Sequence, residues 1–205
     1  MSFKKIHPAL QEALDLLEFD IPLPFQKQLL PKIKSGVNVY GIGPKGCGKS
    51  TAIIISTLQK LECKAFEDAP RALIFVADKQ KALALADDFK RFTKRMDLRI
   101  YCAYDEQNIE DQRADIYDGV DIVIATPKRL NKIFFLNGIN LSQLKLFIIE
   151  DAEFLKKASA YSDVIRTPES IEKCQYVVLA TVFDERLERM RNVFMHNAIT
   201  VKANE

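Results

Sequence analysis

The stretch from Gly43 to Ser50 constrains the fold of this chain more than any other. It reads G-P-K-G-C-G-K-S and matches the pattern G-x-x-x-x-G-K-[ST], in which a glycine-rich turn joins a strand to a helix. The apolar residues before it predict a buried strand over 37–42, and the residues after it predict a helix from Ser50 to about Phe66. This is the context in which such a stretch binds phosphate.

The residues of this loop have separate roles in phosphate binding. Gly46 and Gly48 allow a tight turn that aims successive N–H groups inward, and the dipole of the following helix adds positive charge there. We expect Lys49 to reach the β- and γ-phosphates of a nucleotide, and the Ser50 hydroxyl to ligate Mg²⁺. The alternative, a glycine-rich turn without function, is disfavoured by the strand and helix around it. The predicted nucleotide-binding loop comprises Gly43, Gly46, Cys47, Gly48, Lys49, Ser50 and Thr51.

The rest of the chain alternates apolar runs with helical patterns. Further strands are predicted over 71–77, 98–103, 121–125, 144–149, 175–180 and 198–201. Helices are predicted over 8–18, 25–34, 79–95, 108–117 and 184–195, and from Thr126-Pro127 onward. This alternation predicts an α/β fold with a mostly parallel sheet and helices on both faces. Ligands of such sheets bind beyond the carboxyl ends of the strands, which would gather Gly43, Ala77, Thr126, Glu150 and Thr181 on one rim.

Length and composition limit the alternatives. We expect 205 residues to form one domain. The formal net charge of +2 does not identify a polyanion-binding protein, so any basic patch must be local. The four cysteines are scattered without a C-x-x-C pair, which argues against a zinc site or disulfides and favours a reducing compartment, the cytoplasm ahead of the nucleus. No apolar run approaches the roughly 18 residues of a transmembrane helix, and we expect no membrane partner.

A phosphate-binding loop needs an acidic partner for Mg²⁺ at the end of a second buried strand. The run L-F-I-I-E-D provides Glu150 and Asp151 at such a position. The alternative is that these acids only cap the following helix. Their place directly after a buried strand favours the metal site, with Glu150 and Ser50 as the protein ligands.

Around these residues the sequence resembles the first RecA-like domain of a DEAD-box RNA helicase, from about Phe19 to Thr181. Four stretches resemble family motifs. The residues F-D-I-P-L-P-F-Q at 19–26 resemble the Q motif, and residues 43–51 resemble motif I. T-P-K-R at 126–129 resembles the T-P-G-R motif, and L-A-T at 179–181 resembles the S-A-T motif. E-D-A-E at 150–153 stands where the family has D-E-A-D. Phe3 lies about where the family has a further aromatic residue.

The resemblance implies ATP and Mg²⁺ as cofactors, single-stranded RNA as a partner, and a RecA-like fold. Phe19 would stack on adenine, and Gln26 would read the edge of the base. Lys49, Glu150 and Asp151 would be catalytic: Glu150 would bind Mg²⁺ through water and Asp151 would act as general base. The RNA-binding residues would be Lys79, Thr126, Pro127 and Arg129.

Several departures from the family pattern point to impaired hydrolysis. The order of the two acids is exchanged, so Glu150 is one methylene longer and Asp151 one shorter than the family residues. A displacement of about 1 Å can cost on the order of a hundredfold in rate. Glu153 and Leu179 replace the Asp and Ser that link the D-E-A-D and S-A-T motifs, which puts the coupling of hydrolysis to domain closure in question. Asp78 adds a negative charge where RNA would run.

The arginine-finger motif H-R-x-G-R-x-x-R does not occur in these residues. We therefore expect one half of a helicase core, whose second RecA-like domain belongs to the rest of a longer protein.

Our first hypothesis is an ATP- and RNA-binding half with weak hydrolysis. The second is an inactive scaffold that binds partner proteins in an RNA-processing or small-RNA pathway; degenerate motifs of this kind also occur in helicase-like Tudor-domain proteins. A third, another P-loop enzyme such as a nucleotide kinase, is disfavoured by the Q-like and T-P-K-R stretches.

Overall fold

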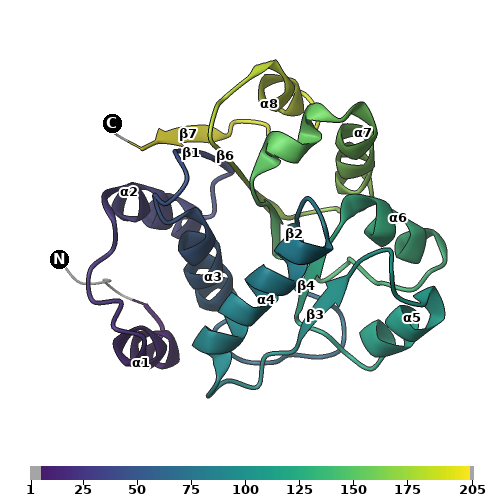
Figure 1. Ribbon diagram of the computed structural model, residues 1–205, viewed down its shortest axis with the longest axis horizontal. Coiled ribbons are helices and arrows are strands. Elements are labelled where there is room, and N and C mark those ends of the chain that lie inside the picture. The colour runs from purple at the N-terminus through teal and green to yellow at the C-terminus, as the bar shows by residue number, and fades with distance from the viewer. Residues whose placement is uncertain (1–5, 204–205) are drawn as a thin grey trace.

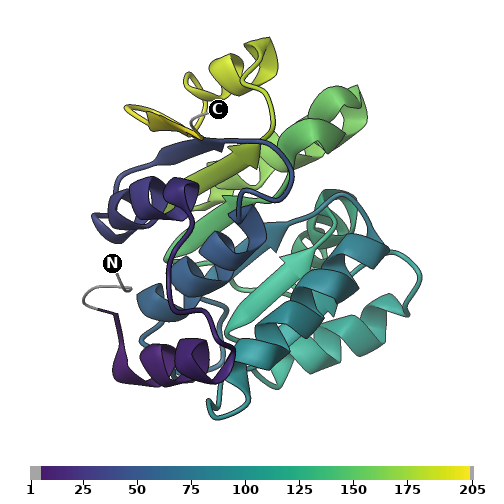
Figure 2. The same cartoon turned by 60° about the vertical axis from the view of Figure 1, so that its left-hand side comes forward.

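The computed structural model describes residues 6–203, in which a seven-stranded sheet lies between two layers of helices (Figures 1 and 2). The strand order is β3-β4-β2-β5-β6-β1-β7, and every neighbouring pair is parallel. The strands are β1 (Val39–Ile42), β2 (Ala72–Phe75), β3 (Ile100–Ala103), β4 (Ile122–Ala125), β5 (Leu146–Ile149), β6 (Gln175–Ala180) and β7 (Ile199–Lys202). The predicted α/β class is confirmed, and the sheet is parallel throughout.

Eight α-helices and two short 3₁₀ helices occur among the described residues. The first four helices are α1 (Pro8–Leu16), α2 (Pro24–Lys34), α3 (Lys49–Lys60) and α4 (Lys79–Thr93). The others are α5 (Ile109–Tyr117), α6 (Pro127–Phe135), α7 (Ala158–Arg166) and α8 (Glu185–Met190), with the 3₁₀ helices η1 (Ala152–Lys156) and η2 (Pro168–Ser170).

Each face of the sheet has its own hydrophobic core. Helices α1 to α4 cover one face, where Leu14, Leu29 and Phe89 meet strand residues such as Ile74. Helices α5 to α8 cover the other face, where Phe75 of the same strand packs. Successive residues of a strand point to opposite faces, so strands covered on both sides must be apolar along their whole length. This explains the continuous apolar runs in the sequence.

Two helices end earlier than the sequence predicts. Helix α3 stops at Lys60 rather than near Phe66, because Glu62 and Cys63 adopt left-handed backbone conformations with φ of 56° and 53°. The Cys63 N–H then donates to the Leu58 carbonyl, which closes the helix end. Helix α8 stops at Met190 rather than at residue 195, and the following residues form tight turns. Helix α7 and the two 3₁₀ helices were not predicted at all.

A buried ion-pair network joins the amino-terminal ends of β2, β3 and β4. The Asp121 carboxylate is fully buried and accepts hydrogen bonds from Arg71 at 2.7 Å and from the Arg99 side chain at 3.0 Å. It also accepts from the backbone N–H groups of Arg99 and Phe66. These four bonds connect three strands at the edge opposite the phosphate-binding loop.

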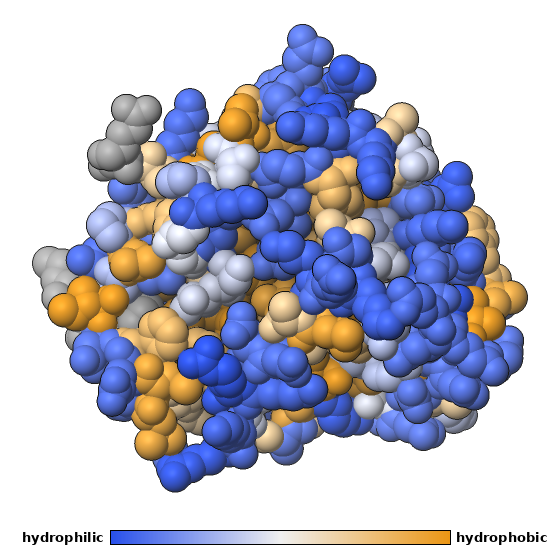
Figure 3. Space-filling view, viewed as in Figure 1, coloured by the Kyte–Doolittle hydropathy of each residue, from blue (hydrophilic) through white to orange (hydrophobic). Residues whose placement is uncertain are grey.

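The face of the domain shown in Figure 3 is predominantly polar. Hydrophilic side chains cover most of the face shown in Figure 3, and hydrophobic side chains form separate small groups on it. Between residues 6 and 203, no helix combines the length and apolar character required to cross a membrane.

Candidate nucleotide-binding site

The phosphate-binding loop follows β1 and leads into α3, as the sequence predicts. Its two inner glycines have left-handed backbones, with φ of 84° at Gly46 and 90° at Gly48. A Cβ atom on Gly48 would lie 2.5 Å from Nε2 of Gln26, so packing as well as backbone conformation requires glycine there. Because α3 begins at Lys49, its amino-terminal N–H groups face the loop, where an anion would bind.

Lys49 lies at the base of the loop and is 7% exposed. Its Nζ donates to the carbonyl oxygens of Gly43 at 2.8 Å and Pro44 at 3.0 Å. These carbonyls hold the ammonium group inside the loop. A phosphate group would therefore replace two hydrogen bonds with a stronger, charge-assisted contact.

Ser50 and Glu150 are brought together from α3 and the end of β5. The Ser50 hydroxyl donates to Oε1 of Glu150 at 2.7 Å, and Glu150 is only 6% exposed. Burial raises the pKa of Glu150 and the nearby Asp151 carboxylate adds to this, while the Ser50 hydrogen bond acts in the opposite direction. Mg²⁺ typically binds through one or two protein oxygens together with phosphates and water, so this oxygen pair fits the predicted ion.

Asp151 points from the end of β5 towards the loop. Its backbone is left-handed, with φ of 48°, and its Oδ1 lies 3.8 Å from Nζ of Lys49. Its Oδ2 lies 3.6 Å from Nζ of Lys81 on α4. Lys81 was not predicted as a site residue, although it lies two positions after Lys79 in the stretch A-D-K-Q-K-A at 77–82. The Asp151 carboxylate is therefore held between two ammonium groups.

Of the two residues predicted to recognise adenine, only Gln26 contacts the phosphate-binding loop among the interactions of the described residues. Gln26 is 3% exposed; its Oε1 accepts from the Leu23 N–H at 2.9 Å and its Nε2 donates to the Gly48 carbonyl at 3.1 Å. It thus joins the start of α2 to the phosphate-binding loop. Phe19 is half-buried and packs against Phe92, with ring centroids 5.6 Å apart. Phe3 lies outside the described residues, and Thr51 lies in the first turn of α3.

The link between the E-D-A-E and L-A-T stretches is present, which corrects the sequence expectation. Glu153 accepts hydrogen bonds from both the backbone N–H and the hydroxyl of Thr181, which lies 28 positions away. Burial alone would raise the pKa of Glu153, but the two bonds from Thr181 lower it overall. The longer Glu side chain reaches Thr181 directly, so the bond does not need a hydroxyl at Leu179. Leu179 packs instead in the core beside Gly41.

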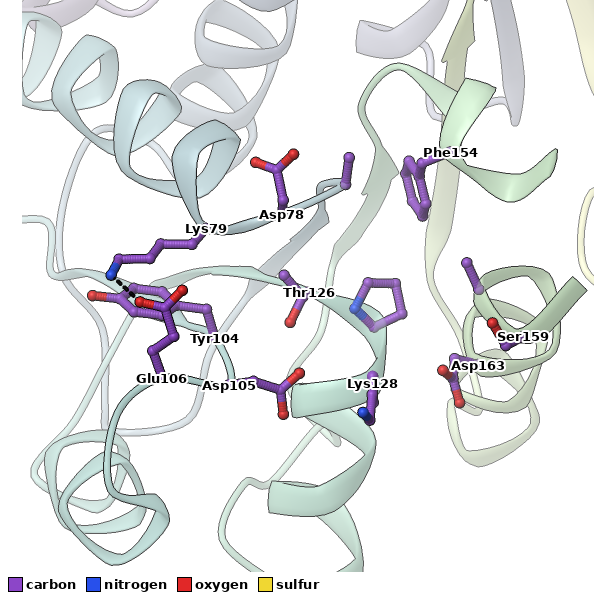
Figure 4. A pocket seen from close by; sticks show the side chains of 13 residues that line it. Asp78, Lys79, Tyr104, Asp105, Glu106, Thr126, Lys128, Phe154, Ser159 and Asp163 are labelled. Carbon is purple, nitrogen blue, oxygen red and sulfur yellow. Dashed lines mark hydrogen bonds and ion pairs between the residues drawn. The ribbon is translucent and has the colours of Figure 1, made fainter. Parts of the chain in front are cut away.

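The predicted RNA-binding residues are less available than the sequence indicates. Arg129 is 5% exposed, and its guanidinium donates to the Gln112 side chain and the Gln107 carbonyl. In this conformation Arg129 joins α5 to α6, and its expected contact with an RNA phosphate stays a prediction. Lys79 forms an ion pair with Glu106 (Figure 4). Pro127 is buried at the start of α6.

Thr126 has an unusual environment. It precedes α6 at the N-cap position, yet its side chain makes no capping hydrogen bond. Its Oγ1 atom is buried and has no hydrogen-bond partner. Such an atom is expensive to leave unsatisfied, so a ligand that donates or accepts a hydrogen bond would be stabilised there.

The chain matches known helicases over most of its length. The model of the DEAD/DEAH box helicase family matches residues 23–190. The pre-mRNA-processing ATP-dependent RNA helicase PRP5 of Meyerozyma guilliermondii is 27% identical over 194 residues, which cover 91% of this chain and 22% of that protein. The probable ATP-dependent RNA helicase DDX46 of Homo sapiens is 25% identical over 191 residues, which cover 90% of this chain and 18% of that protein.

Solved structures show the same fold. A DEAD box protein from the hyperthermophile Methanococcus jannaschii superimposes with a TM-score of 0.89 at 18% identity, covering 98% of this chain and 55% of that one. The yeast DEAD-box splicing factor Prp28 superimposes with a TM-score of 0.88 at 17% identity, covering 99% of this chain and 51% of that one. The chain thus spans about a fifth of these curated relatives and about half of these solved structures. From the family match and the geometry of the phosphate-binding loop, this chain belongs to the DEAD/DEAH box helicase family as an amino-terminal RecA-like domain.

Proposed function

We propose that this domain binds adenine nucleotides together with Mg²⁺ and hydrolyses ATP weakly within a longer protein. The observation that carries the proposal is the convergence of Lys49, Ser50 and Glu150 at the carboxyl ends of β1 and β5. Lys49 would bind the β- and γ-phosphates, and Ser50 and Glu150 would hold Mg²⁺. When bound, this ion neutralises charge that develops on the transferred phosphoryl group.

Weak hydrolysis follows from the exchanged acids. The general base must hold a water molecule in line with the γ-phosphate, and Asp151 has one carbon fewer than the family residue with which to do so. Its carboxylate also forms ion pairs with Lys49 and Lys81, which engage the oxygens that would hold the water. Phosphoryl transfer depends on positioning, so both effects act on the rate of the chemical step.

RNA binding by this half is proposed to be weak. With Arg129 buried and Lys79 paired to Glu106, few cations remain for phosphate contacts on this surface. Few phosphate contacts give low affinity and a shallow dependence on salt. The named relatives are ATP-dependent RNA helicases, and we propose that the longer protein contains the second RecA-like domain on which such an activity depends. The expected cytoplasmic location gains no support from relatives named for pre-mRNA processing.

Isothermal titration calorimetry with ATP and Mg²⁺ tests the nucleotide site. Lys49→Ala should abolish measurable ATP binding, because it removes the buried ammonium group that meets the phosphates. Lys45→Ala is the matched control: it removes an exposed ammonium group from the same loop and should change affinity less than about threefold. If Lys49→Ala binds ATP as tightly as the unaltered domain, the proposed site is wrong.

The same measurement with GTP tests recognition of the base. Gln26 contacts the loop through the Gly48 carbonyl and lies where it could read the edge of a base, so ATP should bind more tightly than GTP. Equal affinity for the two nucleotides would remove the adenine-recognition part of the proposal and leave the phosphate site standing.

A further inference from the structure

A hollow of about 310 Å³ lies at the carboxyl ends of β2, β3 and β4 (Figure 4). Its walls come from the residues that follow these strands, together with η1 and α7. The resemblance to helicases places the RNA backbone over this surface, because Lys79 and Thr126 both line it. The charges of the hollow do not suit that ligand.

Carboxylates outnumber cations in the hollow. Its lining includes four carboxylates and two ammonium groups, for a formal charge of −2. The charged residues are Asp78, Asp105, Glu106, Asp163, Lys79 and Lys128. A phosphate backbone entering this space would meet repulsion from most of these groups, whereas a cationic ligand would be attracted.

The domain's own side chains show how a cation binds here. The Lys79 ammonium forms an ion pair with Glu106 and lies 5.3 Å from the centroid of the Tyr104 ring. Its hydrogen bond to Glu106 raises the pKa of Lys79. A second ammonium group, that of Lys132, lies 3.2 Å from Asp105. Glu106 and the face of the Tyr104 ring thus bind an ammonium group, that of Lys79, within this hollow.

Two further carboxylates have no cation. Asp78 accepts a hydrogen bond from the Lys81 N–H at the start of α4, and Asp163 accepts one from the Asn131 side chain. Within residues 6–203, neither forms an ion pair at 4.0 Å or less. Figure 4 shows Asp78 and Asp163 on either side of the hollow, with Phe154 on the same side as Asp163 and Thr126 between them.

We propose that this hollow binds an extended lysine- or arginine-rich segment of a partner protein in preference to RNA. Cationic side chains of the segment would pair with Asp78 and Asp163, and an arginine would lie against the Phe154 ring. The volume accommodates a few side chains and no folded domain, which favours an extended segment. This binding is separate from the nucleotide site.

Fluorescence anisotropy with labelled ligands compares the two partners directly. The whole 205-residue chain would be titrated against an arginine-rich peptide, an acidic peptide of equal length and a single-stranded oligouridylate, all in the same low-salt buffer. The arginine-rich peptide should bind more tightly than the RNA, and the acidic peptide should not bind. If the RNA binds more tightly than the arginine-rich peptide, the proposal is overturned.

The triple variant Asp78→Asn, Asp105→Asn, Asp163→Asn locates the peptide site. Asparagine keeps the shape of each side chain and is also a good helix cap at position 78. The variant should bind the arginine-rich peptide about tenfold more weakly, as expected for loss of the two ion pairs at Asp78 and Asp163 together with the longer-range attraction of Asp105. It should bind RNA more tightly than the unaltered chain does. Misfolding would not produce these opposite changes.

The control variant Asp87→Asn, Glu172→Gln, Glu185→Gln changes the net charge equally at exposed positions outside the hollow. It should leave peptide affinity within about twofold. An equal loss in both variants would mean general charge attraction and would refute the hollow as the site. ATP binding measured on the same samples distinguishes the peptide site from the nucleotide site. If the peptide does not bind as proposed while ATP still binds, only the peptide site is refuted.

Discussion

At the scale of single residues, Glu150 shows the conflict between stability and function in this site. Its carboxylate is buried and accepts one hydrogen bond, from Ser50. Because its pKa is raised, the native state binds the proton more tightly than the unfolded state does. The contribution of Glu150 to stability is therefore most favourable in acid, and it is lost as the pH rises from the ordinary value near 4.5 through the folded-state pKa. At neutral pH the domain carries this cost at the residue that we propose as a ligand for Mg²⁺.

Replacing Glu150 by glutamine should stabilise the domain without nucleotide. Removal of the buried charge should add about 1 kcal/mol at pH 7, raising the melting temperature by roughly 2–4 °C in thermal unfolding followed by circular dichroism. The gain should shrink towards pH 4.5, where the native carboxylate is protonated. The same variant should lose the increase in ATP affinity that Mg²⁺ produces.

Asp151→Asn provides the comparison, since Asp151 is 31% exposed and already faces two ammonium groups. It should not raise the melting temperature. A lower melting temperature for Glu150→Gln at pH 7 would contradict the assigned cost of the buried charge.

At the scale of elements, Asp121 determines how the first residues of β2, β3 and β4 are held together. Burial alone would raise the pKa of its carboxyl group, but hydrogen bonds from Arg99 and Arg71 lower it overall. A lowered carboxyl pKa contributes stability above the ordinary value of 3.8, and this stability is lost as the pH falls through the folded-state pKa. The network therefore stabilises the sheet at neutral pH and fails in acid.

Asp121→Asn should destabilise the domain by about 3 kcal/mol at pH 7, because the buried guanidinium of Arg71 and the partly exposed guanidinium of Arg99 lose their anion. Urea unfolding would show a lower midpoint with an unchanged slope. The difference from the unaltered domain should narrow below pH 4. Asp68→Asn is the control, since Asp68 contacts the same Arg99 at 3.5 Å but is 80% exposed, and it should cost less than about 0.5 kcal/mol. Equal losses from the two variants would contradict the role given to burial.

At the scale of the whole molecule, we expect any ATP hydrolysis to depend on this domain together with the proposed second RecA-like domain. The bond between Glu153 and Thr181 is present, so the exchange of Glu150 and Asp151 remains the main local reason to expect slow turnover. Restoring the family order with Glu150→Asp and Asp151→Glu together should raise RNA-stimulated ATP turnover by on the order of tenfold or more. The measurement requires the longer protein with its second RecA-like domain.

The 205-residue chain alone serves as the control for that experiment. It contains no arginine-finger motif, so the exchange should leave its turnover negligible. If the natural order already hydrolyses ATP at a rate typical of the family, and the double exchange does not change it, Glu150 and Asp151 do not impair catalysis.

Local sequence determined the strand, turn and helix around Gly43 to Ser50, since glycine positions, apolar runs and helix starts act over a few neighbouring residues. The same local patterns determined the α/β class and placed the acids after β5. Helix ends were less predictable: α3 stops where Glu62 and Cys63 adopt left-handed conformations, which no short-range pattern required.

Only the tertiary structure decided which charges remain free to act. Arg129 reads as an exposed cation in its motif, yet Gln107 and Gln112 of another segment bury it. From the sequence, Glu153 is expected not to connect the E-D-A-E and L-A-T stretches. It nevertheless accepts a hydrogen bond from Thr181, because the ends of β5 and β6 lie side by side. Lys79 and Lys81 likewise meet Glu106 and Asp151 only because parallel strands end on one rim. Electrostatic contacts depend on distance in space, and distances between remote segments are set by how the whole sheet and its helices pack.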